Sequence, residues 1–261
     1  METNKKLSKN ELSTEEYRKL LKYLAEKSNT LFLTFTGGEF FLRKDAIELT
    51  RIASEFNYCF SILSNGILID EKIADALAET VPMKMRFTLF SYIPELHDDF
   101  TGIKGSFNKT INAIRLMRER DITTHISYPI LNITKEIDFD KICEFMDNLD
   151  VQFTLSTTIL PPRKRDVEQS EISYFSDSSE FSKITNDMKK YIEKNSEYYS
   201  SDIEQLDTLK DNAKKTGLYI PCSAGVNSLA VNPYGDISPC AMFFDTVVLG
   251  NVRNDDILDI F

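Results

Sequence analysis

The sequence predicts an α/β fold built on a parallel sheet. Short apolar, strand-like runs alternate with helix-like segments of about 10–14 residues, which is the pattern of βαβ units. Several of the strand-like runs are apolar nearly throughout, as expected when helices cover both faces of a sheet. Because βαβ connections share one hand, a curved or closed sheet follows from a series of them.

Five strands and five helices are expected along the first part of the chain. The strands are predicted over Leu31–Thr36, Tyr58–Leu63, Lys84–Phe90, Thr123–Ile130 and Val151–Ile159. Apolar residues at helical spacing predict helices over Glu15–Lys27, Asp45–Phe56, Asp70–Thr80, Phe107–Arg120 and Phe139–Leu149. Ser13 and Thr14 are expected to cap the first helix, and Ser106 the fourth.

The composition then changes twice, which predicts three regions. Residues 1–160 carry the repeated helices and strands. A polar connecting region rich in Ser and Glu follows over residues 161–215, with surface helices expected around Phe181–Glu193 and Ile203–Lys214. Residues 216–261 are rich in Cys, Gly and Pro and contain short strand-like runs, so we expect a small separate segment there.

Charge and hydropathy narrow the classes of function. The chain has 261 residues, a net charge of −10 and a pI of about 4.9. Such an acidic surface repels phosphate backbones, so we expect no nucleic-acid partner, and a basic peptide or a small molecule fits better. The sequence has no apolar run of about 20 residues and no secretory signal, which predicts a cytoplasmic protein that does not bind membranes.

Two glycines and a glutamate, Gly37-Gly38-Glu39, end the first predicted strand. Ligands of parallel α/β folds bind at the carboxyl ends of the strands. Glycines let a backbone approach a ligand closely, and a carboxylate accepts hydrogen bonds from an ammonium group. The alternative is an ordinary turn with an exposed glutamate. Ser64-Asn65-Gly66 ends the next strand in the same way.

The C-terminal segment contains two cysteines on either side of a predicted turn. Cys222 and Cys240 flank a predicted turn at Pro233–Asp236, which would bring the two thiols close to each other. Two thiolates make half of a tetrahedral zinc or iron–sulfur site. A disulfide and two unrelated buried cysteines are the alternatives. Cys59 and Cys143 lie far apart on a predicted strand and helix, and we expect both to pack in the core.

Taken in order, these motifs resemble the radical S-adenosylmethionine (SAM) family, and in particular its peptide maturases with a SPASM extension. Gly37-Gly38-Glu39 matches the segment that binds the amino group of SAM, and Ser64-Asn65-Gly66 matches the turn after the family's third strand. The stretch His97–Phe107 resembles a loop of the peptide-modifying branch. The resemblance implies that Gly37, Gly38, Glu39, Ser64 and Asn65 bind SAM, and that Cys222 and Cys240 bind metal.

The same resemblance implies a partial (β/α)6 barrel of the TIM type, followed by a small SPASM-like extension that contains cysteines. SAM and a [4Fe–4S] cluster are the implied cofactors. The sequence departs from the family at its reactive cluster, because it contains no Cys-x3-Cys-x2-Cys. Glu11–Glu16 resembles sequence found just after that loop, so we expect a chain truncated at both ends that cannot bind the reactive cluster alone. Phe40 stands where the family usually has proline.

Two hypotheses for function follow. The first is a SAM-dependent peptide-modifying enzyme, or a fragment of one, that acts on a ribosomally made peptide and is inactive as this isolated chain. The second is a non-catalytic relative that binds a peptide or a protein. Because the neighbouring strand of the family is absent, Leu31–Thr36 would form an uncharged apolar sheet edge, and we expect possible self-association through it.

Overall fold

The computed structural model describes residues 10–129, 138–156, 186–187, 190, 224–244 and 246–261. It divides the chain into two compact units, Leu12–Tyr174 and Met1–Glu11 with Phe175–Phe261. Apart from three helical residues (Asn186, Asp187 and Lys190), the two predicted surface helices lie outside the described residues. Among the described helices, none has the length and apolar character needed to cross a membrane.

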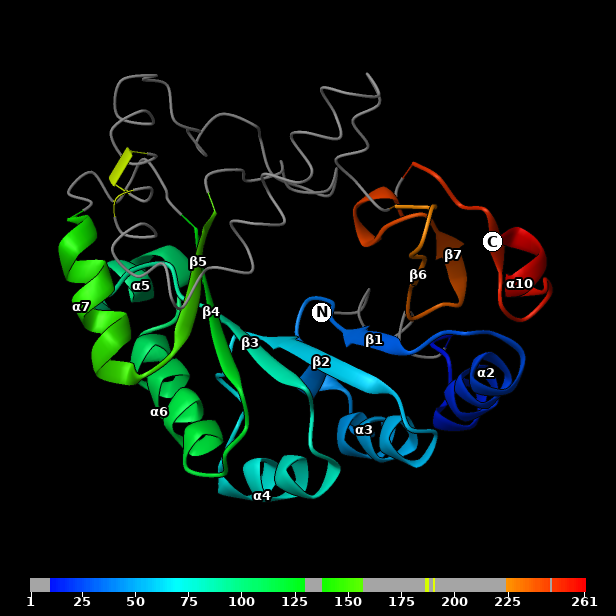
Figure 1. The fold of residues 1–261 in the computed structure, drawn as a ribbon, viewed down its shortest axis with the longest axis horizontal. Coiled ribbons are helices and arrows are strands. Elements are labelled where there is room, and N and C mark those ends of the chain that lie inside the picture. Colours follow the sequence, from blue (N-terminus) through cyan, green and yellow to red (C-terminus); the bar gives the residue numbers. More distant parts are fainter. Residues whose placement is uncertain (1–9, 130–137, 157–185, 188–189, 191–223, 245) are drawn as a thin grey trace. The chain divides into compact units, whose positions relative to one another are not determined.

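The Leu12–Tyr174 unit is built on the predicted parallel sheet. Its strands pair in the order of the sequence, and every pair is parallel. The sheet curves, and helices line its outer side (Figure 1). This arrangement confirms the expected α/β architecture. The strands are β1 (Phe32–Phe35), β2 (Cys59–Ser64), β3 (Lys84–Thr88), β4 (Thr124–Pro129) and β5 (Gln152–Ser156).

Five of the helices fall where the apolar spacing predicts them. They are α2 (Thr14–Lys27), α3 (Ala46–Glu55), α4 (Glu71–Thr80), α6 (Ser106–Arg118) and α7 (Phe139–Leu149). Two short elements were not predicted: the 3-10 helix η1 (Phe40–Leu42) and helix α5 (Pro94–Thr101). Helix α5 begins with a proline at its first turn, where the missing N–H costs nothing.

The core of this unit lies between the sheet and the helices on its outer side. Phe60 and Ile62 of β2 and Phe87 of β3 are at most 1% exposed. Ile52 of α3 and Ile114 of α6 are also fully buried. Burial of each such side chain stabilises the fold by roughly 1.5–3 kcal/mol, so apolar packing holds the sheet and its helices together.

Two expectations about single residues of this unit are wrong. Cys59 is exposed on β2, because it begins the strand; Cys143 of α7 is buried as expected. Ser106 does not cap α6: Gly105 is the N-cap, and Ser106 is the first helical residue. The capping acceptor is instead Asp98, whose carboxylate accepts hydrogen bonds from the N–H groups of Gly105 (2.5 Å) and Phe107 (2.9 Å).

The second unit contains a small antiparallel sheet of strands β6 (Ala230–Val231), β7 (Asp236–Ser238) and β8 (Gly250–Asn251). The turn between β6 and β7 closes where the sequence places Pro233–Asp236, with Gly235 at a φ of +91°. A 3-10 helix, η2 (Ala241–Phe243), and a short helix, α10 (Ile257–Ile260), follow.

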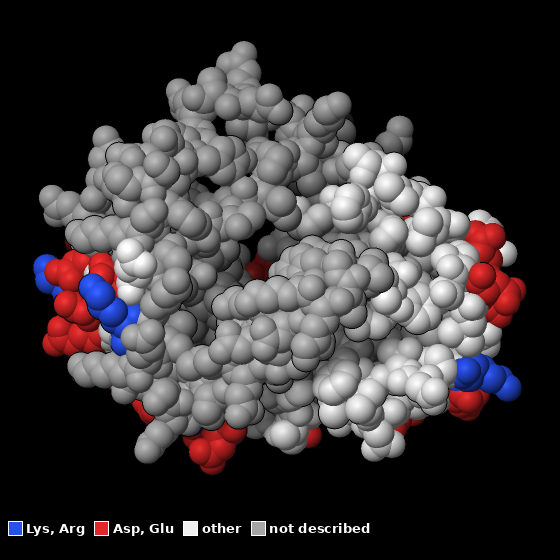
Figure 2. Space-filling view, turned by 45° about the horizontal axis from the view of Figure 1, so that its top comes forward, with Lys and Arg blue, Asp and Glu red and all other residues white. Residues whose placement is uncertain are grey.

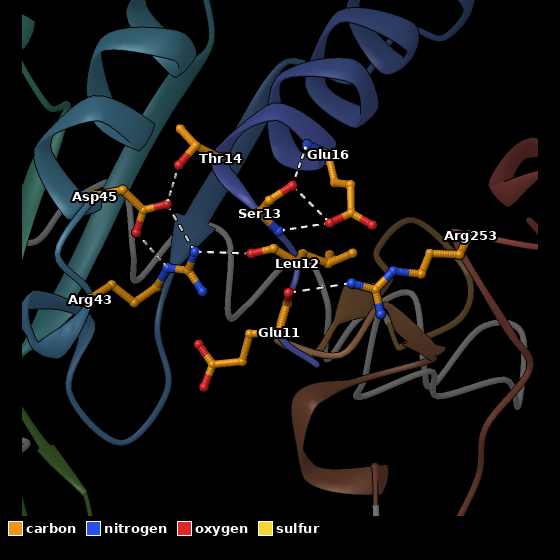
Figure 3. Close-up of polar contacts among 8 residues, drawn as sticks. All are labelled: Glu11, Leu12, Ser13, Thr14, Glu16, Arg43, Asp45 and Arg253. Carbon is orange, nitrogen blue, oxygen red and sulfur yellow. Dashed lines mark hydrogen bonds and ion pairs between the residues drawn. The ribbon is translucent and has the colours of Figure 1, made fainter. Parts of the chain in front are cut away.

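The chain passes from one unit to the other at the peptide bond between Glu11 and Leu12. On each side of this bond, an arginine of the same unit donates to backbone carbonyls (Figure 3). In the C-terminal unit, Arg253 donates to the carbonyls of Asn10 (3.0 Å) and Glu11 (3.3 Å). In the other unit, Arg43 donates to the carbonyl of Leu12 (3.0 Å) and is paired with Asp45. Within the Leu12–Tyr174 unit, the bond from Arg43 fixes the backbone just before α2.

The surface of the described residues agrees with the acidic composition. On the face drawn in Figure 2, the charged side chains of the described residues are more often acidic than basic. Several basic side chains of the described residues are paired with acidic ones. Arg120, for instance, contacts both Glu71 (2.5 Å) and Asp75 (2.7 Å), and Arg18 contacts Glu55 (2.6 Å).

Candidate functional site

The candidate site lies where two neighbouring strands end. In the parallel pair β1–β2, Phe35 lies opposite Ile62, so the residues that follow the two strands meet at the same edge of the sheet. Thr36-Gly37-Gly38-Glu39 follows β1, and Asn65-Gly66 follows β2. This is the edge at which parallel α/β folds bind their ligands.

The carboxylate of Glu39 joins the two strand ends. Its Oε1 accepts hydrogen bonds from the hydroxyl of Ser64 (2.9 Å) and from the N–H of Phe41 (3.2 Å). Its Oε2 accepts one from the N–H of Asn65 (2.9 Å). A carboxylate offers about four lone-pair positions, so three bonds hold this group in one orientation and leave acceptor capacity on it.

The two glycines before Glu39 leave open space among the described residues. Apart from their own chain neighbours, no described atom lies within 4 Å of a Cβ placed on Gly37 or Gly38. Gly37 has a φ of +146°, a conformation that L side chains rarely adopt. The bare backbone therefore offers room for a ligand beside Glu39.

Phe40, which stands where proline is expected, is held by an aromatic contact. Its side chain is buried, and its ring stacks on that of Phe35 with centroids 4.9 Å apart. It also begins the 3-10 helix η1, which Glu39 caps through Phe41. The contact with Phe35 thus fixes the start of this turn. A proline at this position would instead restrict the backbone through its own ring.

Hydrogen bonds within the turn after β2 hold its shape. The N–H of Gly66 donates to the Ser64 hydroxyl (2.9 Å), and the N–H of Ile67 donates to the side-chain oxygen of Asn65 (2.9 Å). Gly66 has a φ of +79°, and a Cβ there would lie 3.1 Å from the Phe87 ring. Ser64 and Asn65 therefore shape the site and hold Glu39.

Residues of the motif between His97 and Phe107 order the end of β3. The N–H of Phe90 donates to Nδ1 of buried His97 (3.3 Å), and burial lowers the pKa of that imidazole. The amides of Phe107 and Gly105 lower the pKa of the Asp98 carboxyl. These hydrogen bonds give His97 and Asp98 structural roles in this segment.

Of the two predicted metal ligands, only Cys240 lies among the described residues. It precedes η2 and is half-buried, and its carbonyl accepts a hydrogen bond from the Ser238 hydroxyl (3.1 Å). Cys222 lies outside the described residues. Within the described part of the chain, no three His, Cys, Asp or Glu side chains come together as a metal site would require.

Sequence comparison decides the family. The profile of the Radical SAM superfamily matches residues 3–146, more than half of the chain. The chain belongs to the radical SAM superfamily. A second profile, the SPASM iron–sulfur cluster-binding domain, matches residues 222–261 of this radical SAM chain. The resemblance read from Gly37-Gly38-Glu39 and from Cys222 and Cys240 is thereby confirmed at the level of the family.

Two curated relatives of this radical SAM chain have names that refer to different biosynthetic reactions. The antilisterial bacteriocin subtilosin biosynthesis protein AlbA of Bacillus subtilis is 26% identical over 96% of the chain and 53% of AlbA. The AdoMet-dependent heme synthase of Oleidesulfovibrio alaskensis is 29% identical over 51% of the chain and 35% of that protein. The chain thus spans about half of the first relative and about a third of the second.

Among solved structures, SuiB of Streptococcus suis shares the fold. The match has a TM-score of 0.71 and 16% identity, and it covers 95% of this radical SAM chain and 58% of SuiB. SuiB has been crystallised with S-adenosylmethionine and with its precursor peptide SuiA. The likeness confirms the α/β radical SAM architecture expected from the sequence.

The residues of the radical SAM chain fit the two cofactors of its family unequally. The amino group of SAM fits Glu39, which keeps acceptor capacity beside the open space at Gly37 and Gly38. A reactive [4Fe–4S] cluster held by three thiolates does not fit, because the four cysteines of the sequence nowhere have the spacing Cys-x3-Cys-x2-Cys. The SPASM segment provides Cys240 among the described residues.

Proposed function

We propose that this chain binds SAM at Glu39 and serves as the SAM-binding barrel and SPASM segment of an enzyme that modifies a ribosomally made peptide. The observation that carries the proposal is the carboxylate of Glu39, held by three hydrogen bonds beside two glycines with open space around them. Gly37, Gly38, Glu39, Ser64 and Asn65 are the proposed cofactor-binding residues.

Each of these residues has a distinct task. Glu39 accepts hydrogen bonds from the ammonium group of the bound methionine moiety. Ser64 and Asn65 orient Glu39 through its two oxygens. Gly37 and Gly38 allow the ligand to approach the backbone. In this family, a [4Fe–4S] cluster supplies the electron for reductive cleavage of the sulfonium.

Binding of SAM and its competitor 5′-methylthioadenosine, measured by calorimetry, tests this assignment. Glu39→Gln removes the charge that attracts the ammonium group, so SAM affinity falls about ten- to hundredfold. Affinity for 5′-methylthioadenosine, which lacks the amino acid portion, stays as in the wild type. Asp138→Asn is the matched control, because Asp138 also caps a helix through its carboxylate but lies at α7. Equal SAM affinity in the wild type and Glu39→Gln overturns the site.

Peptide modification is supported by the nature of the relatives. AlbA, which aligns with nearly the whole chain, is named for the biosynthesis of a bacteriocin, and SuiB has been crystallised with a precursor peptide. The net charge of −10 favours a basic peptide. Fluorescence anisotropy with labelled peptides from short reading frames beside the gene tests this. Tight binding of an iron porphyrin and of none of these peptides would favour the heme synthase side of the family.

We further propose that the isolated chain does not cleave SAM. No three cysteines in the sequence have the spacing that the reactive cluster needs. After reconstitution with iron and sulfide, and under dithionite, no 5′-deoxyadenosine should form above a control without protein. Its formation would contradict the proposal. A chain that binds a peptide but neither SAM nor a cluster would instead be the non-catalytic binding module.

The SPASM segment is proposed to use Cys222 and Cys240 as two ligands of an incomplete metal site. Their sequence spacing and the β6–β7 turn support this pairing. Iron-reconstituted protein should therefore lack a stoichiometric [4Fe–4S] absorption spectrum. A full spectrum that is abolished by Cys222→Ala would show a complete site.

Self-association through the edge of β1 is proposed as well, with a second copy of the chain as the partner. Among the described strands, β1 pairs with β2 alone. Phe32 is 64% exposed and Leu31 50%, and neither is charged. Unpaired backbone groups on such an edge favour pairing with another strand.

A further inference from the structure

The turn that holds Glu39 is itself held by a residue 45 positions away in the sequence. The hydroxyl of Thr110, in α6, donates a hydrogen bond of 2.7 Å to the carbonyl of Asn65. Thr110 is 1% exposed, so its hydroxyl has almost no access to water. A threonine in a helix commonly bonds a carbonyl of its own preceding turn, as Thr50 does with Ile47. The Thr110 bond instead reaches another element.

The packing around this bond is close. A Cβ on Gly66 would lie 3.1 Å from the Cβ of Ala113, so the backbone of the turn lies directly against α6. Thr110 and Ala113 are three residues apart and therefore share one face of the helix. The turn after β2 thus meets α6 through one hydrogen bond and through the close approach of the Gly66 backbone to Ala113.

The helix that carries Thr110 is fixed at its own beginning. The Asp98 carboxylate accepts hydrogen bonds from Gly105, Phe107 and the hydroxyl of Ser106. Two of these bonds satisfy N–H groups at the start of α6, those of the N-cap residue Gly105 and of Phe107. Thr110 lies one turn further along, so its hydroxyl is presented from a well-anchored part of the helix.

We propose that Thr110 is a positioning residue for the SAM site. By holding the carbonyl of Asn65, it fixes the residue whose N–H donates to Oε2 of Glu39. Thr110 touches neither the carboxylate nor the proposed ligand. It acts through Asn65, and the proposal rests on the assignment of Glu39 to SAM binding.

Three variants separate positioning from general stability. Thr110→Val keeps the shape of the side chain but removes the donor, which leaves the Asn65 carbonyl without this partner. Thr110→Ser restores a donor. Thr50→Val is the matched control, because Thr50 is likewise buried in a helix and its hydroxyl donates to Ile47 within α3.

Two measurements apply to all three variants: calorimetric SAM affinity, and amide hydrogen exchange over residues 64–67. In Thr110→Val, SAM affinity should fall about three- to tenfold, and the amides of the turn should exchange faster by a similar factor. Thr110→Ser should return both values toward the wild type. Thr50→Val should change neither, although it loses a comparable hydrogen bond.

The outcomes are distinguishable from a failure of the proposed function. Wild-type exchange and affinity in Thr110→Val, or an equal change in Thr50→Val, would overturn the role of Thr110. If the turn exchanges faster in Thr110→Val while no variant, the wild type included, binds SAM, then the assignment of Glu39 to SAM fails and the hydrogen-bond chain from Thr110 to Glu39 stands.

Discussion

The strands of the Leu12–Tyr174 unit have four to six residues and carry a buried core, whereas β6, β7 and β8 of the other unit have two or three residues each. Among the described residues of the C-terminal unit, the buried apolar side chains are Ile237 and Ile257. Its turns are instead tied by side-chain amides and carboxylates. Asp236, for example, accepts from the side chains of Asn232 and Asn251, each at 2.9 Å.

This difference suggests how each unit maintains its shape. Burial of apolar surface contributes most of the stability of the larger unit. A small segment with little core depends on specific polar bonds, and small domains of this kind commonly rely on metal as well. The match of residues 222–261 to an iron–sulfur cluster-binding domain agrees with that expectation.

The largest effect is expected from a core substitution in the larger unit. Phe60→Ala leaves a cavity beneath β2, where Phe60 is 1% exposed and packs edge-on against Phe35. We expect the free energy of unfolding to fall by about 3–5 kcal/mol, measured by urea denaturation. Phe32→Ala on the neighbouring strand is the control and should cost less than about 0.5 kcal/mol, because Phe32 is largely exposed. Similar losses would show that this core does not determine stability.

A polar substitution should have a smaller and more local effect in the C-terminal unit. Asp236→Ala removes the acceptor of Asn232 and Asn251, so the local opening free energy of the small sheet should fall by about 1–3 kcal/mol. Hydrogen exchange over residues 230–251 measures this loss. The exposed Asp259→Ala in α10 serves as the control. Equal loosening of β2 and β3 would mean that the two units do not open independently.

The Asp98 cap gives the larger unit a pH dependence. The N–H groups of Phe107 and Gly105 lower the folded-state pKa of Asp98. Its contribution to stability is therefore present above the unfolded pKa of about 3.9 and is lost as the pH falls through the lower, folded pKa. Urea midpoints between pH 6 and pH 2 should fall less steeply in Asp98→Asn than in the wild type. Asp99→Asn, which removes none of these bonds, should keep the wild-type slope.

A substitution at the edge of β1 should reduce self-association and leave the stability of the fold nearly unchanged. Phe32→Lys places a charge on the exposed edge, and sedimentation velocity should then show less self-association than in the wild type. A wild type that stays monomeric at all concentrations, with the amides of β1 strongly protected from exchange, would contradict the proposed edge pairing.

Much of the larger unit could be predicted from the sequence because its signals are local. The five apolar runs and the five amphipathic segments predict strands and helices whose ends lie within about two residues of those observed, except that the last predicted strand extends to Ile159, outside the described residues, while β5 ends at Ser156. Helix α5 is not evident from the sequence, because its eight residues include the polar His97, Asp98 and Asp99, which favour a loop. The outward position of Cys59 depends on where β2 begins, which composition does not specify.

The site was predictable only in part. Gly37-Gly38-Glu39 and Ser64-Asn65 were identified by their place after two strands, but the three bonds that hold Glu39 required the observed pairing of β1 and β2. Thr110 carries no recognisable signal, because its bond to Asn65 joins residues 45 positions apart. The capping role of Asp98 likewise depends on helix α5, which places Asp98 beside the start of α6 eight residues later.

Hydrogen exchange with and without SAM, at a concentration that just saturates the wild type, is the sharpest test of whether SAM binds at Glu39, because it reports on both units in one experiment. We expect slower exchange at residues 36–42 and 64–67, where Glu39 joins the two strand ends, and unchanged exchange over residues 230–251. Glu39→Gln should show weaker protection at this same SAM concentration, because its affinity is about ten- to hundredfold lower. Protection confined to residues 230–251, or protection at residues 36–42 that is equally strong in Glu39→Gln, would contradict the assignment of SAM to this site.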